Sequence, residues 1–69
     1  MNEILFRANG KERTAAPGAT VADVLSSLDL RPSAVVVERN GEPLDRARFS
    51  QTPVCAGDRL EIAQMVGGG

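Results

Sequence analysis

The chain has 69 residues, of which 42% are hydrophobic and 25% are charged, and its formal net charge is -1. These values are typical of one small globular domain, with little room for an internal active-site cavity. The eight Lys and Arg residues alternate with acids and only Phe6 and Phe49 are aromatic, which excludes a basic stacking surface for nucleic acid.

The residue inventory also argues against an enzyme. The chain lacks His, and its single cysteine, Cys55, can form neither an internal disulfide nor a thiolate cluster. No Ser or Cys has a candidate base beside it, and the acids form no paired-carboxylate motif. We interpret Cys55 as a small apolar filler. The apolar run Ile4-Leu5-Phe6 is too short for a signal peptide or a membrane span, so we expect a cytoplasmic protein that does not enter the membrane.

The first element in chain order is a predicted β-hairpin. Residues 3–8 place Ile4, Phe6 and Ala8 on one face of a strand. Asn9-Gly10 is a strong signal for a type I′ turn, because both of its positions need positive φ. A second strand over residues 11–15 should therefore pair antiparallel with the first.

A helix is predicted next, from Val21 to about Leu30. Thr20 is a good N-cap, and Asp23 stands at the capping-box position. Apolar residues recur at helical spacing and would form one buried stripe: Val21, Val24, Leu25 and Leu28. Arg31-Pro32 should end the helix, because the residue before proline disfavours the α region.

Three further strands are predicted after the helix: residues 34–38, 42–44 and 59–66. The first contains the β-branched run Val35-Val36-Val37, and Asn40-Gly41 turns it into the second, a short edge segment. Residues 45–53 are predicted to be irregular, with Phe49 as their anchor in the core. Glu38-Arg39 is interpreted as a solvated ion pair.

This order of elements predicts an α+β fold. One helix cannot cover both faces of a four- or five-stranded sheet, so a two-layer unit with one open sheet face is expected. The arrangement matches the ubiquitin-like β-grasp, with a mixed four- to five-stranded sheet and one main helix packed on one face. We predict a domain over residues 1–66 and a flexible glycine tail over residues 67–69.

The tail Gly67-Gly68-Gly69 carries the strongest functional signal. Glycine has no Cβ, so three in a row make a thin segment that can enter a narrow channel of a partner. There the Gly69 carboxylate could attack the α-phosphate of ATP and give an acyl-adenylate. The alternative is a frayed chain end without function.

Several segments along the chain together form a recognisable pattern: Asn9-Gly10, Gly18-Ala19-Thr20-Val21, Asp23-Val24-Leu25, Val36-Val37-Glu38-Arg39-Asn40, the Phe49 region, Gly57-Asp58-Arg59-Leu60-Glu61-Ile62 and Val66-Gly67-Gly68-Gly69. Through these segments nearly the whole chain resembles the ubiquitin-like sulfur carrier proteins of the ThiS family of thiamine biosynthesis. It implies that Gly69 is the site of adenylation and thiocarboxylate formation, while Gly67 and Gly68 pass through the partner's channel.

The resemblance also implies three partners and no catalytic activity of the chain's own. An E1-like adenylyltransferase (ThiF-type) would activate Gly69, a cysteine desulfurase or another donor would supply sulfur, and a thiazole synthase (ThiG-type) would receive it. ATP and magnesium would belong to the activating partner, so this chain is expected to bind no cofactor and no metal.

Apolar residues that alternate away from the predicted core mark a surface for partner docking. If Ile4, Phe6, Val35 and Val37 face the helix, five residues are expected to form an apolar docking patch on the open face and near the tail: Leu5, Val36, Ala63, Met65 and Val66. The alternative is that isolated apolar side chains on a surface are ordinary.

Other functions stay open, and one of them is a carrier that feeds cysteine or another metabolite. The small subunit of molybdopterin synthase uses the same fold and glycine chemistry, but tends to be longer and to have proline just before its final glycines, where this chain has Gln64-Met65-Val66. A ubiquitin-like protein modifier or interaction module, joined to its target through Gly69 or simply docking, belongs to a different class.

Overall fold

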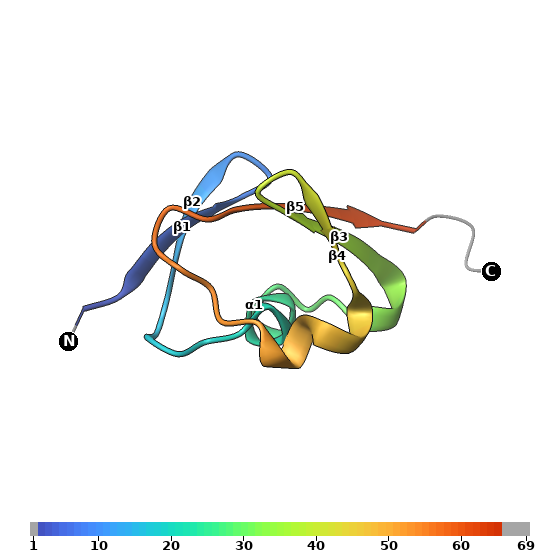
Figure 1. Ribbon diagram of the computed structural model, residues 1–69, viewed down its shortest axis with the longest axis horizontal. Coiled ribbons are helices and arrows are strands. Elements are labelled where there is room, and N and C mark those ends of the chain that lie inside the picture. Colours follow the sequence, from blue (N-terminus) through green and yellow to red (C-terminus); the bar gives the residue numbers. More distant parts are fainter. Residues whose placement is uncertain (1, 66–69) are drawn as a thin grey trace.

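The computed structural model describes residues 2–65 and contains a five-stranded mixed sheet with one α-helix against one face (Figure 1). The strands are β1 (Ile4–Ala8), β2 (Lys11–Ala15), β3 (Val35–Arg39), β4 (Glu42–Leu44) and β5 (Arg59–Gln64), in the spatial order β2-β1-β5-β3-β4. The central pair β1–β5 is parallel and the other pairs are antiparallel. The predicted α+β, ubiquitin-like β-grasp fold is confirmed.

Both tight hairpin turns have the predicted backbone geometry. Asn9 and Gly10 have φ of 52° and 80°, and Asn40 and Gly41 have φ of 54° and 86°. A type I′ turn requires positive φ at both central residues, and asparagine and glycine reach that region most readily. The Asn-Gly pairs therefore determine where β1 turns into β2 and where β3 turns into β4.

Helix α1 (Val21–Ser27) begins as predicted but ends earlier than predicted. At its start the Thr20 hydroxyl accepts from the Asp23 N–H at 3.2 Å, and the Asp23 carboxylate accepts from the Thr20 N–H at 2.9 Å. At its end Asp29 has φ of 58°, and the Leu30 N–H donates to the Leu25 carbonyl at 2.9 Å. This left-handed residue terminates the helix before Arg31-Pro32 is reached, so the prediction of a helix to about Leu30 is wrong.

The core lies between α1 and the inner face of the sheet, which Figure 1 shows above the helix. Its buried residues come from both layers and from the loops: Phe6, Ala8, Val21, Val24, Leu25, Val35, Val37, Phe49, Val54, Leu60 and Ile62. Phe49 is buried as predicted. Its segment is not irregular, however, because Arg46–Gln51 forms the 3₁₀ helix η2, which lies beside α1. A second 3₁₀ helix, η1 (Pro32–Ala34), leads into β3.

The last strand is described to Gln64, whereas residues 59–66 were predicted. Val66 and the predicted tail over residues 67–69 lie outside the described residues, so the domain boundary after residue 66 stays a prediction. No helix within residues 2–65 is long and apolar enough to cross a membrane.

Candidate functional site

Strand β5 is the element that leads to the glycine tail, and it lies in the middle of the sheet. Leu60 and Ile62 point into the core, while Glu61 and Ala63 alternate onto the open face. On one side β5 pairs with β3 along the strand, from Leu60 opposite Arg39 to Gln64 opposite Val35. The Met65 N–H then donates to the Ala34 carbonyl at 2.8 Å, so this attachment continues to the last described residue.

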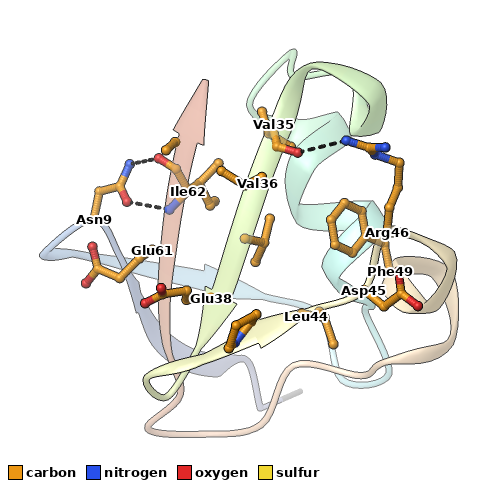
Figure 2. A pocket seen from close by; sticks show the side chains of 13 residues that line it. Asn9, Val35, Val36, Glu38, Leu44, Asp45, Arg46, Phe49, Glu61 and Ile62 are labelled. Carbon is orange, nitrogen blue, oxygen red and sulfur yellow. Dashed lines mark hydrogen bonds between the residues drawn. The ribbon is translucent and has the colours of Figure 1, made fainter. Parts of the chain in front are cut away.

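Asn9 fixes the other side of β5. Its backbone N–H donates to the Leu60 carbonyl at 2.9 Å. Its side-chain amide then makes two bonds to one residue, because Nδ2 donates to the Ile62 carbonyl at 3.0 Å and Oδ1 accepts from the Ile62 N–H at 2.7 Å (Figure 2). The side chain thus takes the place of a strand where β1 has already turned away. Sequence reasoning assigned Asn9 only to the turn and missed this role.

The open face carries the exposed apolar residues that were predicted for docking. Val36 lies directly opposite Ala63, and Met65 comes directly after Gln64, the last residue of β5. Val36 is 55% exposed and Met65 is 50% exposed. We refer to Val36, Ala63 and Met65 together as the distal patch, since they lie at the end of the sheet nearest the tail.

Leu5 is separate from the distal patch. It is 49% exposed and shares the open face, as predicted. In the parallel pair of β1 and β5, however, Arg7 lies opposite Arg59, so Leu5 is level with Gly57. Gly57 comes six residues before Ala63. At about 3.3 Å per residue this separation is roughly 20 Å. Leu5 therefore does not form one patch with Val36, Ala63 and Met65, and Val66 lies outside the described residues.

Charged residues occupy the face between Leu5 and the distal patch. Glu38 lies opposite Glu61, and Arg7 lies opposite Arg59. No salt bridge within residues 2–65 involves any of these four side chains. Like charges opposite each other on a sheet are destabilising, so these two pairs are not explained by stability. Val36, Ala63 and the two glutamates border a surface hollow of about 580 Å³ that also reaches Pro43 (Figure 2).

Arg46 covers the outer edge of β3 beside this hollow. Its Nε donates to the Pro32 carbonyl at 2.8 Å. Its Nη2 donates to the Val35 carbonyl at 3.4 Å, a bond that is drawn in Figure 2. Strand β4 ends at Leu44 and does not reach Val35. The guanidinium group therefore satisfies carbonyls that no strand pairs.

A polar cluster at the opposite end of the sheet corrects two predictions. Cys55 is exposed, so its assignment as an apolar filler is wrong. Arg39 pairs with Asp58 at 3.0 Å, not with Glu38 in a solvated pair. Its Nη2 also lies 3.6 Å from the Cys55 sulfur.

Within residues 2–65 no three His, Cys, Asp or Glu side chains are grouped as a metal site.

Asp58 is the buried centre of this cluster. Its carboxylate accepts from the Cys55 N–H at 2.8 Å, from Asn40 Nδ2 at 3.0 Å and from Arg39 Nε at 3.0 Å. Burial by itself raises the pKa of Asp58, but these bonds and the Arg39 charge outweigh it and hold that pKa below its ordinary value. The hydrogen bond from Arg39 Nε to the Asp58 carboxylate in turn raises the pKa of Arg39. The cluster therefore joins the Cys55–Asp58 turn to the β3–β4 hairpin through one ionised carboxylate.

A sequence profile of the ThiS family matches residues 3–69, which include the glycine tail. The chain belongs to the ThiS family.

Two relatives place this ThiS-family chain more closely. The sulfur carrier protein ThiS of Bacillus subtilis is 35% identical over 66 residues, which cover 94% of this chain and 100% of that protein. A thiazole synthase of Paramagnetospirillum magneticum is 39% identical over 61 residues. That match covers 88% of the ThiS-family chain but only 19% of the length of the thiazole synthase.

Solved structures agree with the family. The crystal structure of the thiamine biosynthesis protein ThiS from Geobacter metallireducens superposes with a TM-score of 0.79 at 38% identity, covering 96% of this chain and all of that one. A designed protein based on human ubiquitin has a TM-score of 0.56 at 21% identity over 100% of this chain and 98% of its own, a likeness of fold alone. The predicted sulfur carrier of the ThiS family is thus confirmed, whereas the roles of Gly67, Gly68 and Gly69 stay predictions.

Proposed function

We propose that the ThiS-family chain carries sulfur on the carboxyl group of Gly69 for thiazole formation in thiamine biosynthesis. In the first step a Gly69 carboxylate oxygen attacks the α-phosphorus of ATP, and pyrophosphate leaves. In the second step hydrosulfide attacks the acyl carbonyl, and AMP leaves with one of the original carboxylate oxygens. The product is a thiocarboxylate, a sulfur nucleophile that can be delivered to an acceptor.

The attachment of β5 is the observation that carries this proposal. Hydrogen bonds hold the strand as far as Met65, and four residues separate Met65 from the Gly69 carboxyl carbon. Four residues can span at most about 14 Å. The folded part would therefore stop at the rim of a partner's active site while the glycines reach the reacting phosphorus.

Holding the thiocarboxylate on a folded carrier has a physical advantage. A tethered group reaches a high effective concentration at the acceptor once the carrier has docked. The distal patch of Val36, Ala63 and Met65 would supply that docking surface, since contiguous exposed apolar residues mark interaction sites. Val66, which follows Met65, is proposed to extend the patch.

The partners follow from this chemistry. An E1-like adenylyltransferase binds ATP and magnesium, a cysteine desulfurase or another donor supplies sulfur, and a thiazole synthase accepts it. The last assignment is supported by the Paramagnetospirillum magneticum thiazole synthase, in which a segment similar to this chain forms part of a much longer protein. The chain itself acts as a carrier and not as an enzyme, and we propose that it works in the cytoplasm.

Intact-mass analysis tests the proposal. The chain is incubated with the adenylyltransferase, ATP, magnesium and sulfide, and we expect the mass change of one oxygen replaced by sulfur. Deletion of Gly68 and Gly69 should abolish that change and leave the unfolding temperature unaltered, because the core lies within residues 2–65. Glu12→Gln on the edge strand β2 serves as the control and should react like the wild type.

Other results would contradict the carrier. A covalent adduct with a protein would support a ubiquitin-like modifier, and an unchanged mass would support a plain docking module. Modification of the truncated chain would show that the reacting group is not Gly69. Sulfur transfer to a molybdopterin precursor in place of the thiazole would assign the chain to the molybdopterin pathway.

A further inference from the structure

The backbone of β5 has hydrogen-bonding groups on two sides, and their alternation can be followed along the strand. The Met65 N–H donates to Ala34 and the Asn40 N–H donates to the Arg59 carbonyl, both at 2.8 Å. In an antiparallel pair every second residue bonds the partner strand. The odd-numbered residues of β5 therefore bond β3, and Leu60, Ile62 and Gln64 direct their N–H and carbonyl groups to the other side.

On that other side the hydrogen bonds end before Gln64. The Leu60 carbonyl bonds the Asn9 backbone, and both groups of Ile62 bond the Asn9 side chain. Strand β1 has ended at Ala8, and Figure 1 shows β5 continuing past it toward the C-terminal end. Gln64 is exposed, and no residue in the described part of the chain bonds its N–H or its carbonyl on this side.

Other edges of the sheet are protected. Arg46 bonds the Val35 carbonyl on the outer side of β3, β4 has only three residues and includes Pro43, and β2 carries Lys11, Glu12 and Arg13. Charges, proline and short strands are the usual means of preventing a strand from pairing with another chain. The edge at Gln64 carries no charged side chain and no proline, and in the sequence only Met65 and Val66 separate it from the tail.

The tail itself offers a partner little except backbone. Gly67, Gly68 and Gly69 have no side chains, so an enzyme can recognise them only through main-chain N–H and carbonyl groups and through shape. Strand addition at a sheet edge is the common way to bind an extended segment through its main chain.

We infer that the free edge of β5 at Gln64 is a strand-addition site for an extended segment of the thiazole synthase. The Asn9 side chain closes the ladder at Ile62, so it sets the first position that the added strand can occupy. The occupant is assigned to the thiazole synthase because a relative of that name includes a segment similar to this chain. The inference rests on the proposed function and specifies how the carrier holds its partner.

Replacement of Gln64 by proline tests the edge directly. Gln64→Pro removes an N–H that no residue within 2–65 uses, so the hydrogen bonds between β3 and β5 are kept. We expect binding to the thiazole synthase, measured by calorimetry, to weaken about tenfold, which corresponds to the roughly 1.4 kcal/mol of one hydrogen bond. Gln64→Thr keeps the N–H and changes only the side chain, so it should bind like the wild type. Unchanged binding by Gln64→Pro would overturn the inference.

Hydrogen exchange of the wild-type chain gives an independent reading if the proline variant does not fold. The Gln64 amide should exchange rapidly in the free carrier and become protected in the complex with the thiazole synthase. An amide that stays unprotected in the complex rejects the inference. A wild-type dimer that Gln64→Pro dissociates would identify a second copy of this chain as the occupant, which also rejects it. The intact-mass experiment on the wild type reports separately on the carrier function.

Discussion

At the scale of single residues, Asp58 is the side chain with the most connections across the sequence. Its carboxylate bonds the Cys55 N–H within its own turn and joins that turn to Arg39 and Asn40 in the β3–β4 hairpin. The sequence indicates only a turn at Gly57-Asp58. The burial of the carboxylate could not be predicted, because it depends on a hairpin that lies 18 residues earlier in the chain.

Asp58→Asn should lower the free energy of unfolding by about 1–3 kcal/mol at neutral pH, the range for a buried acceptor that loses its charge. The folded-state pKa of Asp58 is depressed, so its contribution is complete above the ordinary pKa of about 3.9 and disappears as the pH falls through the folded-state value. The stability difference between wild type and variant should therefore shrink below about pH 4.

Urea unfolding at pH 7 and at pH 3 measures this difference. Asp45→Asn is the control, because Asp45 is exposed and its side chain makes no capping hydrogen bond. A difference that is equally large at both pH values would show that the ionised Asp58 carboxylate is not the stabilising form.

At the scale of elements, local signals were sufficient for the parts of the fold that local chemistry determines. The two Asn-Gly turns, the Thr20 cap and the alternation of β3 and β5 are all read from neighbouring residues. The end of α1 at Ser27, shortly before the left-handed Asp29, and the 3₁₀ helix over Arg46–Gln51 were missed. Aspartate reaches the left-handed region only in some contexts, and η2 is determined by packing of Phe49 and not by periodicity.

Asn9 shows the same limit for the attachment of β5. Its contact with Ile62 joins residues 53 positions apart. Asn9→Gly keeps the positive φ of the turn and removes both side-chain bonds. We expect the free energy of unfolding to fall by about 1–3 kcal/mol, the sum of two net hydrogen bonds.

Chemical denaturation measures this loss, with Asn2→Gly as the matched control outside the strands. Hydrogen exchange of the Ile62 amide should accelerate in Asn9→Gly. If the variant were as stable as the wild type, the side chain of Asn9 would not be what holds β5 on this side.

At the scale of the whole molecule, the sheet separates a core from a face that is free to dock. Alternation along the strands correctly placed Leu5, Val36 and Ala63 on the open face. Their distances along the sheet could not be predicted, since these depend on the register of the parallel β1–β5 pair. The register divides the predicted patch into the distal patch near the tail and Leu5 at the opposite end.

Val36→Asp should weaken binding to the adenylyltransferase and to the thiazole synthase by about tenfold or more, because a buried carboxylate without a partner is costly at an interface. Stability should stay within about 0.5 kcal/mol of the wild type, since Val36 is exposed. Calorimetric titration and thermal unfolding measure the two effects.

Leu5→Asp makes the same chemical change on the same face, roughly 20 Å from the distal patch. It should bind both enzymes like the wild type. An equal loss of binding in Leu5→Asp would extend the docking surface across the whole face, and full binding by Val36→Asp would remove the distal patch from it.

The bonds that Arg46 makes across the outer edge of β3 have a consequence for the carrier at high concentration. Growth of a fibril needs two unprotected edges on every molecule, one to receive a neighbour and one to offer the next. With β3 covered by a guanidinium group, copies that met through β5 would stop at pairs. Native copies of the carrier that paired in this way would therefore not polymerise further through β3.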